Sequence, residues 1–506
     1  MKLKKRILAF GLVFCFLIGV VYFAHKGSLS TEQMAGTLGN PKESIRVWYT
    51  DEALTDYMNS AAVAFCEENN IRVVPVLVSG LEYLDAINKA SVEEKEMPDL
   101  YVSVNDTLEK AYLAGLASEV QDTQNICTTE YFPKTALNAV TYKDKLLGYP
   151  FYYETSVLLY NKTYMDDVAK TAIESEADVA AAEEAQAEID AAVAEEEIEN
   201  IIDEEGNLVN NDVEEASSDV SQEDIDEKID TVIPKTIDDI LTFADEYDAP
   251  EAVEAVFKWD VSDIFYNYFF VGNYMRVGGD TGDNTDDIDI YNQDTMDCLQ
   301  VYQNLNQFFS IDTEEVTYDS VLQDFMDGKI VFSVVTTDAI AKIEVAKAEG
   351  KFDFEYGVSM LPDVSANLKS RGLSVTNAVV VNGYSDKKEC ANQFAKFITS
   401  DNVINDLYEK TGKVASKLNV TYDNPVVSNV MEEYKKSIPM PKMIETSNYW
   451  MQLEIAFTRI WTGEDINAQL KQLSEQIMTQ VTGTPYEEEV IIKPTEETVT
   501  EADGTE

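Results

Sequence analysis

Four aromatic residues lead into a single carboxylate between residues 149 and 154. The rings belong to Tyr149, Phe151, Tyr152 and Tyr153, and the acid is Glu154. Aromatic faces stack on the C–H surfaces of a sugar, while a carboxylate accepts hydrogen bonds from its hydroxyls. This combination favours a carbohydrate-binding site. The alternative is the end of a buried aromatic strand, which needs the same residue types.

Catalytic and metal-binding patterns are poorly represented in the sequence. His25 is the one histidine, so the chain has no Ser-His or Cys-His pair and no His-rich metal site. Five aspartates lie between Asp280 and Asp289, but their spacing does not fit an EF-hand loop. We therefore expect a solvated loop there, and we predict neither a metal nor a cofactor.

The chain is long and strongly acidic. Its 506 residues suffice for two or more domains, and its net charge is −56. The acid is concentrated: residues 166–230 contain 25 Asp and Glu against two Lys, and residues 487–506 contain eight against one. The remainder is still acidic. Such a chain repels phosphate backbones, which argues against nucleic-acid binding.

The N-terminus carries a membrane-targeting signal. Basic residues between Lys2 and Arg6 precede an uncharged run of 18 residues, Ile7 to Ala24, which spans about 27 Å as a helix. The basic flank keeps the N-terminus in the cytoplasm. We predict an uncleaved signal anchor over residues 1–26 and a linker over residues 27–43, with the rest at the extracellular face of the cell membrane. A cleaved signal peptide is the alternative.

The four cysteines beyond the anchor are widely separated and form no Cys-x-x-Cys pair, so we expect no structural disulfide. Cys66 closes the apolar face of a predicted helix and is expected to be buried. The four are Cys66, Cys127, Cys298 and Cys390.

Strands and helices alternate over the first globular segment. Strands are predicted at Ile45–Tyr49, Ile71–Val78 and Leu100–Val104, with amphipathic helices after each. This alternation indicates βαβ units and a largely parallel sheet. Pro75 within the second strand indicates a sheet edge or a bulge.

The second half begins after the acidic stretch. Residues 166–230 are Ala- and Glu-rich without a sustained heptad, which predicts a solvated insertion that is helical or disordered. Thr236 is placed to cap a helix from Ile237 to Tyr247, and Asp338 a helix from Ala339 to Ala348. The acidic residues 482–506 are expected to form a disordered tail.

Six short motifs resemble those of the maltose-type family (family 1) of bacterial extracellular solute-binding proteins, and they occur in the same order. The resemblance covers about residues 44–480 apart from the acidic insertion. The motifs are Ile45-Arg46-Val47-Trp48, Met97-Pro98-Asp99-Leu100, the segment from Tyr149 to Lys162, Pro234-Lys235-Thr236, the segment from Gly357 to Pro362, and Met440-Pro441 followed by Tyr449-Trp450.

The resemblance implies an α/β, two-lobed periplasmic-binding-protein-like fold of type II, with ligand held in an interlobe cleft that closes by a hinge. Lobe 1 would comprise residues 44–150 plus about 378–410. Lobe 2 would comprise residues 151–165, 231–377 and about 411–481.

The resemblance also assigns ligand contacts. Asp106 and Glu154 fall on sugar-contacting acids, Trp450 on a stacking ring, and Glu52 on a polar position at the exit of the first strand. Ser103 and Asp338 stand where maltose-specific members carry tryptophan, and Thr107 where they carry arginine, so maltodextrin itself is not implied. Further rings are expected from Tyr153, Trp259, Tyr266 and Tyr268, with core packing as the alternative for Trp259, Tyr266 and Tyr268.

These observations predict a non-enzymatic, monomeric substrate-binding subunit of an ABC importer. It would capture a carbohydrate, expected to be an oligosaccharide, and deliver it to the permease subunits. One alternative is a binding protein for a cationic ligand such as a polyamine, held by acids and rings. Another is a membrane-tethered glycosidase using Asp106 and Glu154. A third is a surface adhesin or scaffold that acts through the acidic insertion.

Overall fold

The computed structural model describes residues 43–194, 220–446 and 448–491, which divide into two compact units. Unit 1 consists of the described part of Met1–Tyr131 together with Val140–Phe151 and Asn377–Val420. Unit 2 consists of Phe132–Ala139, Tyr152–Thr376 and the described part of Thr421–Glu506. The chain passes between the units five times, and two of these crossings lie within strands, β6 (Tyr149–Asn161) and β12 (Leu373–Val381).

The sheet of unit 1 has the order β2-β1-β3-β12. Strands β2 (Ile71–Leu77), β1 (Glu43–Tyr49) and β3 (Leu100–Val104) are parallel, and the end of β12 runs antiparallel to β3. The predicted parallel sheet is therefore confirmed. Pro75 pairs with Val47 on β2, the outermost strand, where its missing N–H costs no ladder hydrogen bond on the free side.

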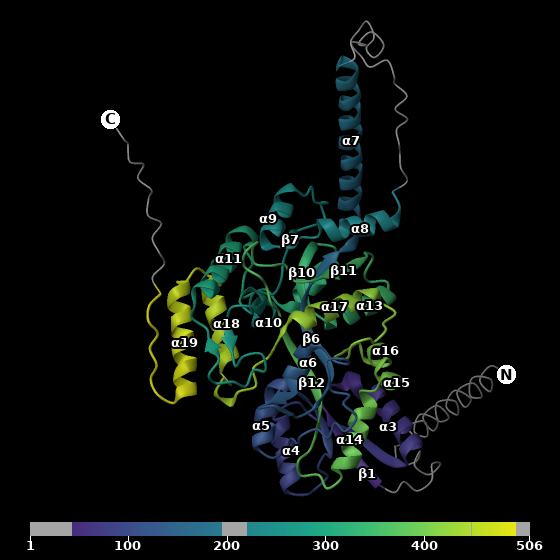
Figure 1. Cartoon of the computed structure of the whole chain (residues 1–506), viewed down its shortest axis with the longest axis vertical. Helices are drawn as coiled ribbons and strands as arrows, with labels where there is room; N and C mark the ends of the chain where they lie inside the picture. Colours follow the sequence, from purple (N-terminus) through teal and green to yellow (C-terminus); the bar gives the residue numbers. More distant parts are fainter. Residues whose placement is uncertain (1–42, 195–219, 447, 492–506) are drawn as a thin grey trace, which may run out of the picture. The chain divides into compact units, whose positions relative to one another are not determined.

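Helices cover both faces of this sheet. In Figure 1, α4 (Tyr83–Val92) and α5 (Leu108–Leu113) lie on one side, and α3 (Thr55–Asn69) and α14 (Lys388–Ile398) on the other. One core cluster joins the first pair to the sheet, and on the other face Phe65 packs on Phe394 with ring centroids 5.2 Å apart. Each fully buried apolar side chain stabilises the unit by about 1.5–3 kcal/mol. The smaller elements of unit 1 are η1 (Glu52–Leu54), η2 (Asn105–Thr107), β4 (Thr141–Tyr142), β5 (Lys145–Leu146), α15 (Asp401–Ile404), α16 (Leu407–Thr411) and β13 (Val414–Ala415).

The sheet of unit 2 is built around β6. It runs antiparallel to both β11 (Tyr356–Ser359) and β10 (Ile330–Thr336), and β10 is parallel to β7 (Ala255–Phe257). Every residue of β6 is buried except Glu154, which is half-buried. The two-residue strand β14 (Ile438–Pro439) pairs with the start of β12.

Three helices of unit 2, two of them near the end of the chain, pack on one another. α18 (Tyr449–Trp461) contacts both α11 (Gln293–Phe309) and α19 (Ile466–Thr482), as Figure 1 shows. The buried Trp461 anchors this group, and its indole N–H donates to the carbonyl of Ile311 at 3.1 Å. The other elements of unit 2 are α9 (Ile237–Glu246), α10 (Ile264–Asn267), η4 (Tyr268–Phe270), β8 (Arg276–Val277), β9 (Ile288–Asp289), α12 (Tyr318–Met326), α13 (Asp338–Ala348), α17 (Pro425–Lys436) and η5 (Ile444–Thr446), while α6 (Lys134–Val140) ends at the boundary.

The two predicted helix caps have different outcomes. Thr236 caps α9 as predicted, in a reciprocal arrangement with Asp239. Asp338 does not cap α13, because Thr337 occupies the capping position and Asp338 is the first helical residue. The carboxylate instead accepts from the hydroxyls of Tyr318, at 2.8 Å, and Thr336.

The predicted insertion is helical at both described ends, and these ends are packed. α7 (Lys162–Ala194) continues directly from β6, and α8 (Gln222–Val232) lies against its base. Lys162 Nζ lies 2.7 Å from carboxylates of both Asp166 and Asp226, and α8 buries Ile225 and Ile229. The expectation of a solvated segment is therefore wrong for α8, which has an apolar face, whereas residues 174–183 of α7 are exposed and helical, as expected. Residues 195–219 lie outside the described part.

The C-terminal expectation is also wrong in part. Residues 483–491 lie along α19 rather than forming a disordered tail. The backbone N–H of Glu488 donates to Glu475 at 3.0 Å, and the amide of Asn467 donates to the carbonyl of Ile491 at 2.9 Å. Residues 492–506 are outside the described residues.

Within the described ranges, no helix is long and apolar enough to cross a membrane. The predicted anchor at residues 1–26 lies outside those ranges. Cys66, Cys127, Cys298 and Cys390 are free thiols, and Cys66 is half-buried rather than buried.

Candidate functional site

Two predicted ligand-binding acids follow neighbouring strands of unit 1. Glu52 lies in η1 after β1, and Asp106 lies in η2 after β3. Because β1 and β3 are parallel neighbours, their carboxyl ends meet at one edge of the sheet, where ligands of open α/β sheets bind. The structure therefore brings Glu52 and Asp106 to the same edge.

Asp106 is the more informative of the two acids. Its Oδ1 atom is buried and has no hydrogen-bond partner among the described residues. Burial raises the pKa of the carboxyl, while hydrogen bonds from the backbone N–H groups of Thr107 and Asp106 itself oppose the rise. A buried acceptor without a donor is uncommon in folded proteins, and a ligand hydroxyl would satisfy it. Glu52, by contrast, is exposed.

Ser103 and Thr107 flank Asp106 at this edge. Their hydroxyls lie 2.9 Å apart, and Thr107 also donates to the carbonyl of Val104 at 2.8 Å. These two positions supply small hydroxyl groups to the edge, and neither a ring nor a cation.

Two other predicted residues lie next to each other on β6 in unit 2. The ring of Tyr153 is fully buried and stacks flat on Tyr434, with centroids 3.6 Å apart and planes at 4°. Burial raises the pKa of Tyr153 well above its ordinary value. Tyr153 therefore fixes the strand through its packing, whereas Glu154 is the residue of β6 that reaches the surface in part.

Trp450 has the surroundings of a stacking ring. It lies in the first turn of α18, next to Tyr449, and is half-buried. Its ring lies 4.9 Å from that of Tyr449 and 5.7 Å from that of Tyr268, and both tyrosines are buried. Tyr268 therefore supports Trp450 from within, and Trp450 retains exposed surface.

Trp259 does not offer a ring to a ligand. It is fully buried, stacks on Phe257 with centroids 4.6 Å apart, and meets the edge of Trp461. Its indole N–H donates to Asn267 at 2.8 Å. The core alternative weighed for this residue is the correct one, because every polar and apolar part of the indole is occupied.

Sequence reasoning missed a second group of rings and charges in unit 2. Tyr266 stacks on Tyr318 with centroids 5.0 Å apart, and the ammonium of Lys342 lies 4.7 Å from the centre of the Tyr318 ring. Lys342 also pairs with Asp338 at 3.0 Å. The sequence singled out Tyr266 and Asp338 but not their partners, because Tyr318 follows an ordinary helix cap and carries no motif.

Three carboxylates lie near this group. Burial raises the pKa of Asp263, and the charge of Asp260 raises it further. Glu454 on α18 also has a raised pKa, from burial and then from Asp263 and Asp260. Their mutual repulsion would be relieved by a cation. The described residues contain no group of acids, histidines and cysteines arranged to hold a metal ion.

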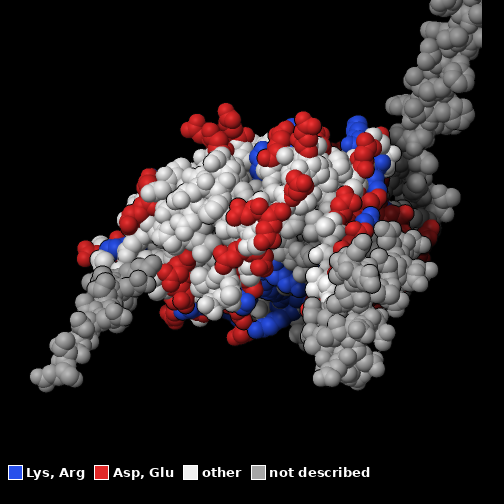
Figure 2. Space-filling view, turned by 90° about the horizontal axis from the view of Figure 1, so that it is seen from above, with Lys and Arg blue, Asp and Glu red and all other residues white. Residues whose placement is uncertain are grey.

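Acidic side chains also predominate on one face of the described surface. On the face drawn in Figure 2, Asp and Glu cover more of the described surface than Lys and Arg do. A ligand that approaches this face is therefore expected to be neutral or cationic rather than anionic.

Comparisons with known proteins give one family. The sequence profile described as "Bacterial extracellular solute-binding protein" matches residues 51–403. No curated protein sequence matches the chain.

Many solved structures share the fold. An extracellular solute-binding protein from Staphylococcus aureus in complex with maltose is 17% identical, with a TM-score of 0.64 over 87% of this chain and 97% of that one. The maltose-binding protein MalE from Listeria monocytogenes, also with maltose, is 20% identical, with a TM-score of 0.63 over 87% and 98%. MalX from Streptococcus pneumoniae, in complex with maltopentaose, is 17% identical, with a TM-score of 0.59 over 87% and 99%. At these identities the likeness shows the fold alone.

Proposed function

The chain belongs to the bacterial extracellular solute-binding proteins, and we propose that it is the substrate-binding subunit of an ABC importer that captures an oligosaccharide. The family consists of binding proteins rather than enzymes, so a glycosidase activity is not proposed. The anchor predicted at residues 1–26 would keep the protein at the outer face of the cell membrane, next to the permease subunits it serves.

The observation that carries the proposal is the unsatisfied hydrogen-bonding capacity of the Asp106 carboxyl group. Its buried, unpartnered oxygen lies at the carboxyl edge of a parallel sheet, where a neutral hydroxyl is the simplest donor to complete it. The half-buried Trp450, supported by Tyr268 and Tyr449, supplies the ring face that a sugar requires. We propose that Glu52 and Glu154 add polar contacts.

The similar structures support a carbohydrate ligand. Those from Staphylococcus aureus and Listeria monocytogenes hold maltose, and the one from Streptococcus pneumoniae holds maltopentaose. Ser103, Thr107 and Asp338 replace the residues of the maltose-specific pattern, so the proposal is an oligosaccharide of unspecified linkage. That the ligand is held in an interlobe cleft is a prediction from the family resemblance of the sequence.

Calorimetric titration with a panel of neutral oligosaccharides tests the proposal. We expect at least one to bind, and we expect Trp450→Ala and Asp106→Asn each to weaken it about tenfold or more. Met451→Ala is the control for the first, because Met451 is the next residue and is 59% exposed. Asp85→Asn is the control for the second, as an exposed acid of the same unit. Equal losses in the variants and their controls would contradict the proposed contacts.

A cationic ligand is the second candidate. The raised pKa values of Asp263 and Glu454, with Asp260 and Tyr266 beside them, favour a polyamine held by ion pairs and cation–π contacts. Spermidine included in the same titration distinguishes the two. Binding of spermidine that Glu454→Gln abolishes, with no response to neutral sugars, would replace the oligosaccharide proposal.

A further inference from the structure

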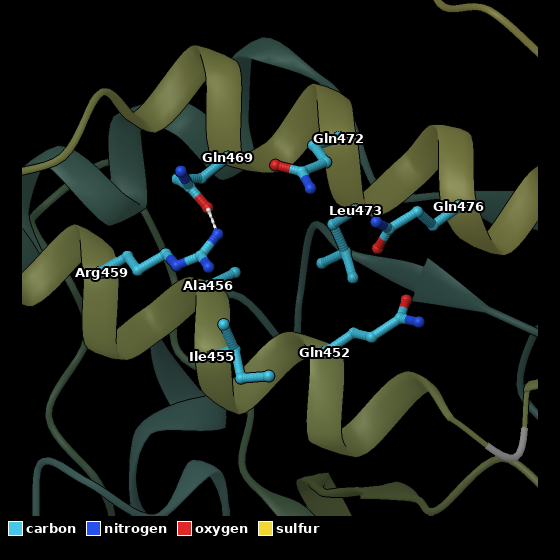
Figure 3. Close-up of a pocket in the computed structure, with 8 residues that line it drawn as sticks. All are labelled: Gln452, Ile455, Ala456, Arg459, Gln469, Gln472, Leu473 and Gln476. Atoms are coloured by element: carbon cyan, nitrogen blue, oxygen red, sulfur yellow. Dashed lines mark hydrogen bonds between the residues drawn. The ribbon is translucent and has the colours of Figure 1, made fainter.

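The facing sides of α18 and α19 enclose a groove of about 190 Å³ within unit 2. On each helix the lining residues occur at positions i, i+3, i+4 and i+7. Residues at this spacing lie on one face of a helix, so each helix lines the groove with a single face. Figure 3 shows Arg459 and Gln469 at one end, Gln452 and Gln476 at the other, and Gln472 between them. Four of the eight lining residues are glutamines, whose side chains carry the same donor and acceptor groups as a peptide bond.

The base of the groove is apolar. Ala456 and Leu473 are buried there, and Ile455 is 45% exposed beside them. The lining includes neither an aromatic ring nor a carboxylate. A sugar site normally supplies a ring for stacking, and a cation site supplies an acid. Neither ligand class therefore matches this groove.

The two ends of the groove would bind opposite groups of a ligand, because one end offers a hydrogen-bond acceptor and the other a donor. At one end the Oε1 atom of Gln452 is buried and has no hydrogen-bond partner among the described residues, so it requires a donor. At the other end the guanidinium of Arg459 donates a hydrogen bond to Gln469 at 3.4 Å and forms no ion pair with a described residue. Gln469 donates to Glu464 at 2.7 Å, while its Oε1 atom accepts from Arg459. The exposed guanidinium of Arg459 has further N–H groups, which can donate to an acceptor on a ligand.

Gln452 and Arg459 are seven residues apart on α18, which corresponds to about 10.5 Å along the helix. Three extended residues of polypeptide span about 10 Å. We propose that this groove binds a short extended peptide of about three residues, with its free carboxylate on Arg459 and an N–H group on Gln452. The glutamine amides between the ends pair with the peptide groups, and the apolar base accepts small side chains. This site is additional to the proposed oligosaccharide site and does not depend on it.

Calorimetric titration of the full chain with triglycine tests the site. The second probe is triglycine amide, which has the same backbone without the carboxylate. We expect triglycine to bind. The amide should bind at least about tenfold more weakly, because a charge-assisted hydrogen bond is lost. Arg459→Gln should reduce triglycine affinity by a similar factor and remove the preference for the acid.

Lys435→Gln is the matched control, since it removes one positive charge from an exposed position of unit 2 outside the groove. It should leave triglycine affinity within about twofold, and the melting temperature of each variant establishes that it is folded. No binding of triglycine, equal affinity for the amide, or an equal loss in Lys435→Gln would overturn the proposal. Binding of a neutral trisaccharide that Arg459→Gln abolishes would also overturn it.

Discussion

At the scale of single residues, the ligand-binding predictions separate according to burial. Asp106 keeps an unsatisfied oxygen and Trp450 a partly exposed ring, whereas the rings of Trp259 and Tyr153 are enclosed by other rings. The buried hydroxyl of Tyr153 also has no hydrogen-bond partner among the described residues. The sequence could not make this distinction, because an aromatic residue beside an acid suits both a strand end in a core and a sugar site. The difference lies in long-range neighbours such as Tyr434 and Trp461.

Asp106→Asn should stabilise the protein at neutral pH. The folded pKa of Asp106 is raised by burial, so the charged form is disfavoured in the folded state, and this cost appears as the pH rises from 3.8 through the folded pKa. An uncharged amide avoids it, with an expected gain of about 1 kcal/mol. Urea unfolding at several pH values measures the difference, which should shrink as the pH falls toward 3.8. A variant that is less stable at pH 7 would contradict the stated cause.

Trp259→Phe should destabilise unit 2 without affecting ligand affinity. The change removes the indole N–H that Asn267 accepts and leaves a cavity beside Trp461, at a cost of about 2–4 kcal/mol. Trp450→Phe is the matched comparison, with a smaller expected loss of stability and a larger loss of affinity. Urea unfolding and calorimetry measure the two effects. If Trp259→Phe lowered ligand affinity and Trp450→Phe did not, Trp259 rather than Trp450 would be the ligand-binding residue.

At the scale of elements, the sequence indicated regular structure well where one periodicity dominated. The β-branched runs gave β1, β2 and β3, and Pro75 indicated the edge position of β2, because a proline cannot complete a central ladder. Composition misled where charge was high. Residues 483–491 are acidic, yet their backbone is held by side chains of α19 such as Asn467 and Glu475. Hydropathy describes side-chain polarity only, so it cannot predict hydrogen bonds to backbone groups.

The base of the α7–α8 pair is expected to contribute to stability. Ile229→Ala removes a side chain that is 2% exposed, and should cost about 2–4 kcal/mol. Glu223→Ala on the exposed face of α8 is the control, with an expected effect within about 0.5 kcal/mol. Thermal or urea unfolding measures both. An equal, small effect of the two substitutions would mean that α8 is a solvated spacer, as the composition alone indicated.

At the scale of the whole molecule, the charge is the property that sequence alone establishes. A net charge of −56 over 506 residues implies strong self-repulsion in the compact state. The family and fold class also followed from the sequence, through six short motifs in order, although the first similar structure is only 17% identical. The groove between α18 and α19 did not follow, because glutamines on a helix are ordinary for a solvated face until a second helix faces them.

Salt should therefore stabilise the protein. Raising NaCl from about 20 to 150 mM shortens the Debye length to about 8 Å and screens repulsion between surface carboxylates. We expect the melting temperature to rise by a few degrees, as measured by scanning calorimetry. The same molar amount of a neutral osmolyte is the control and should give a smaller rise. A melting temperature that falls with salt would indicate that ion pairs such as Lys162–Asp226 outweigh the repulsion.

The route of the chain through β6 and β12 has a consequence for biogenesis. Unit 1 receives the strand next to β3 from residues beyond Asn377, so its sheet is incomplete when the ribosome has made two thirds of the polypeptide. Until then the open side of β3 can pair with foreign strands. Synthesis and export are expected to depend on a chaperone that shields this edge, and slowing translation before residue 377 should increase aggregation rather than yield.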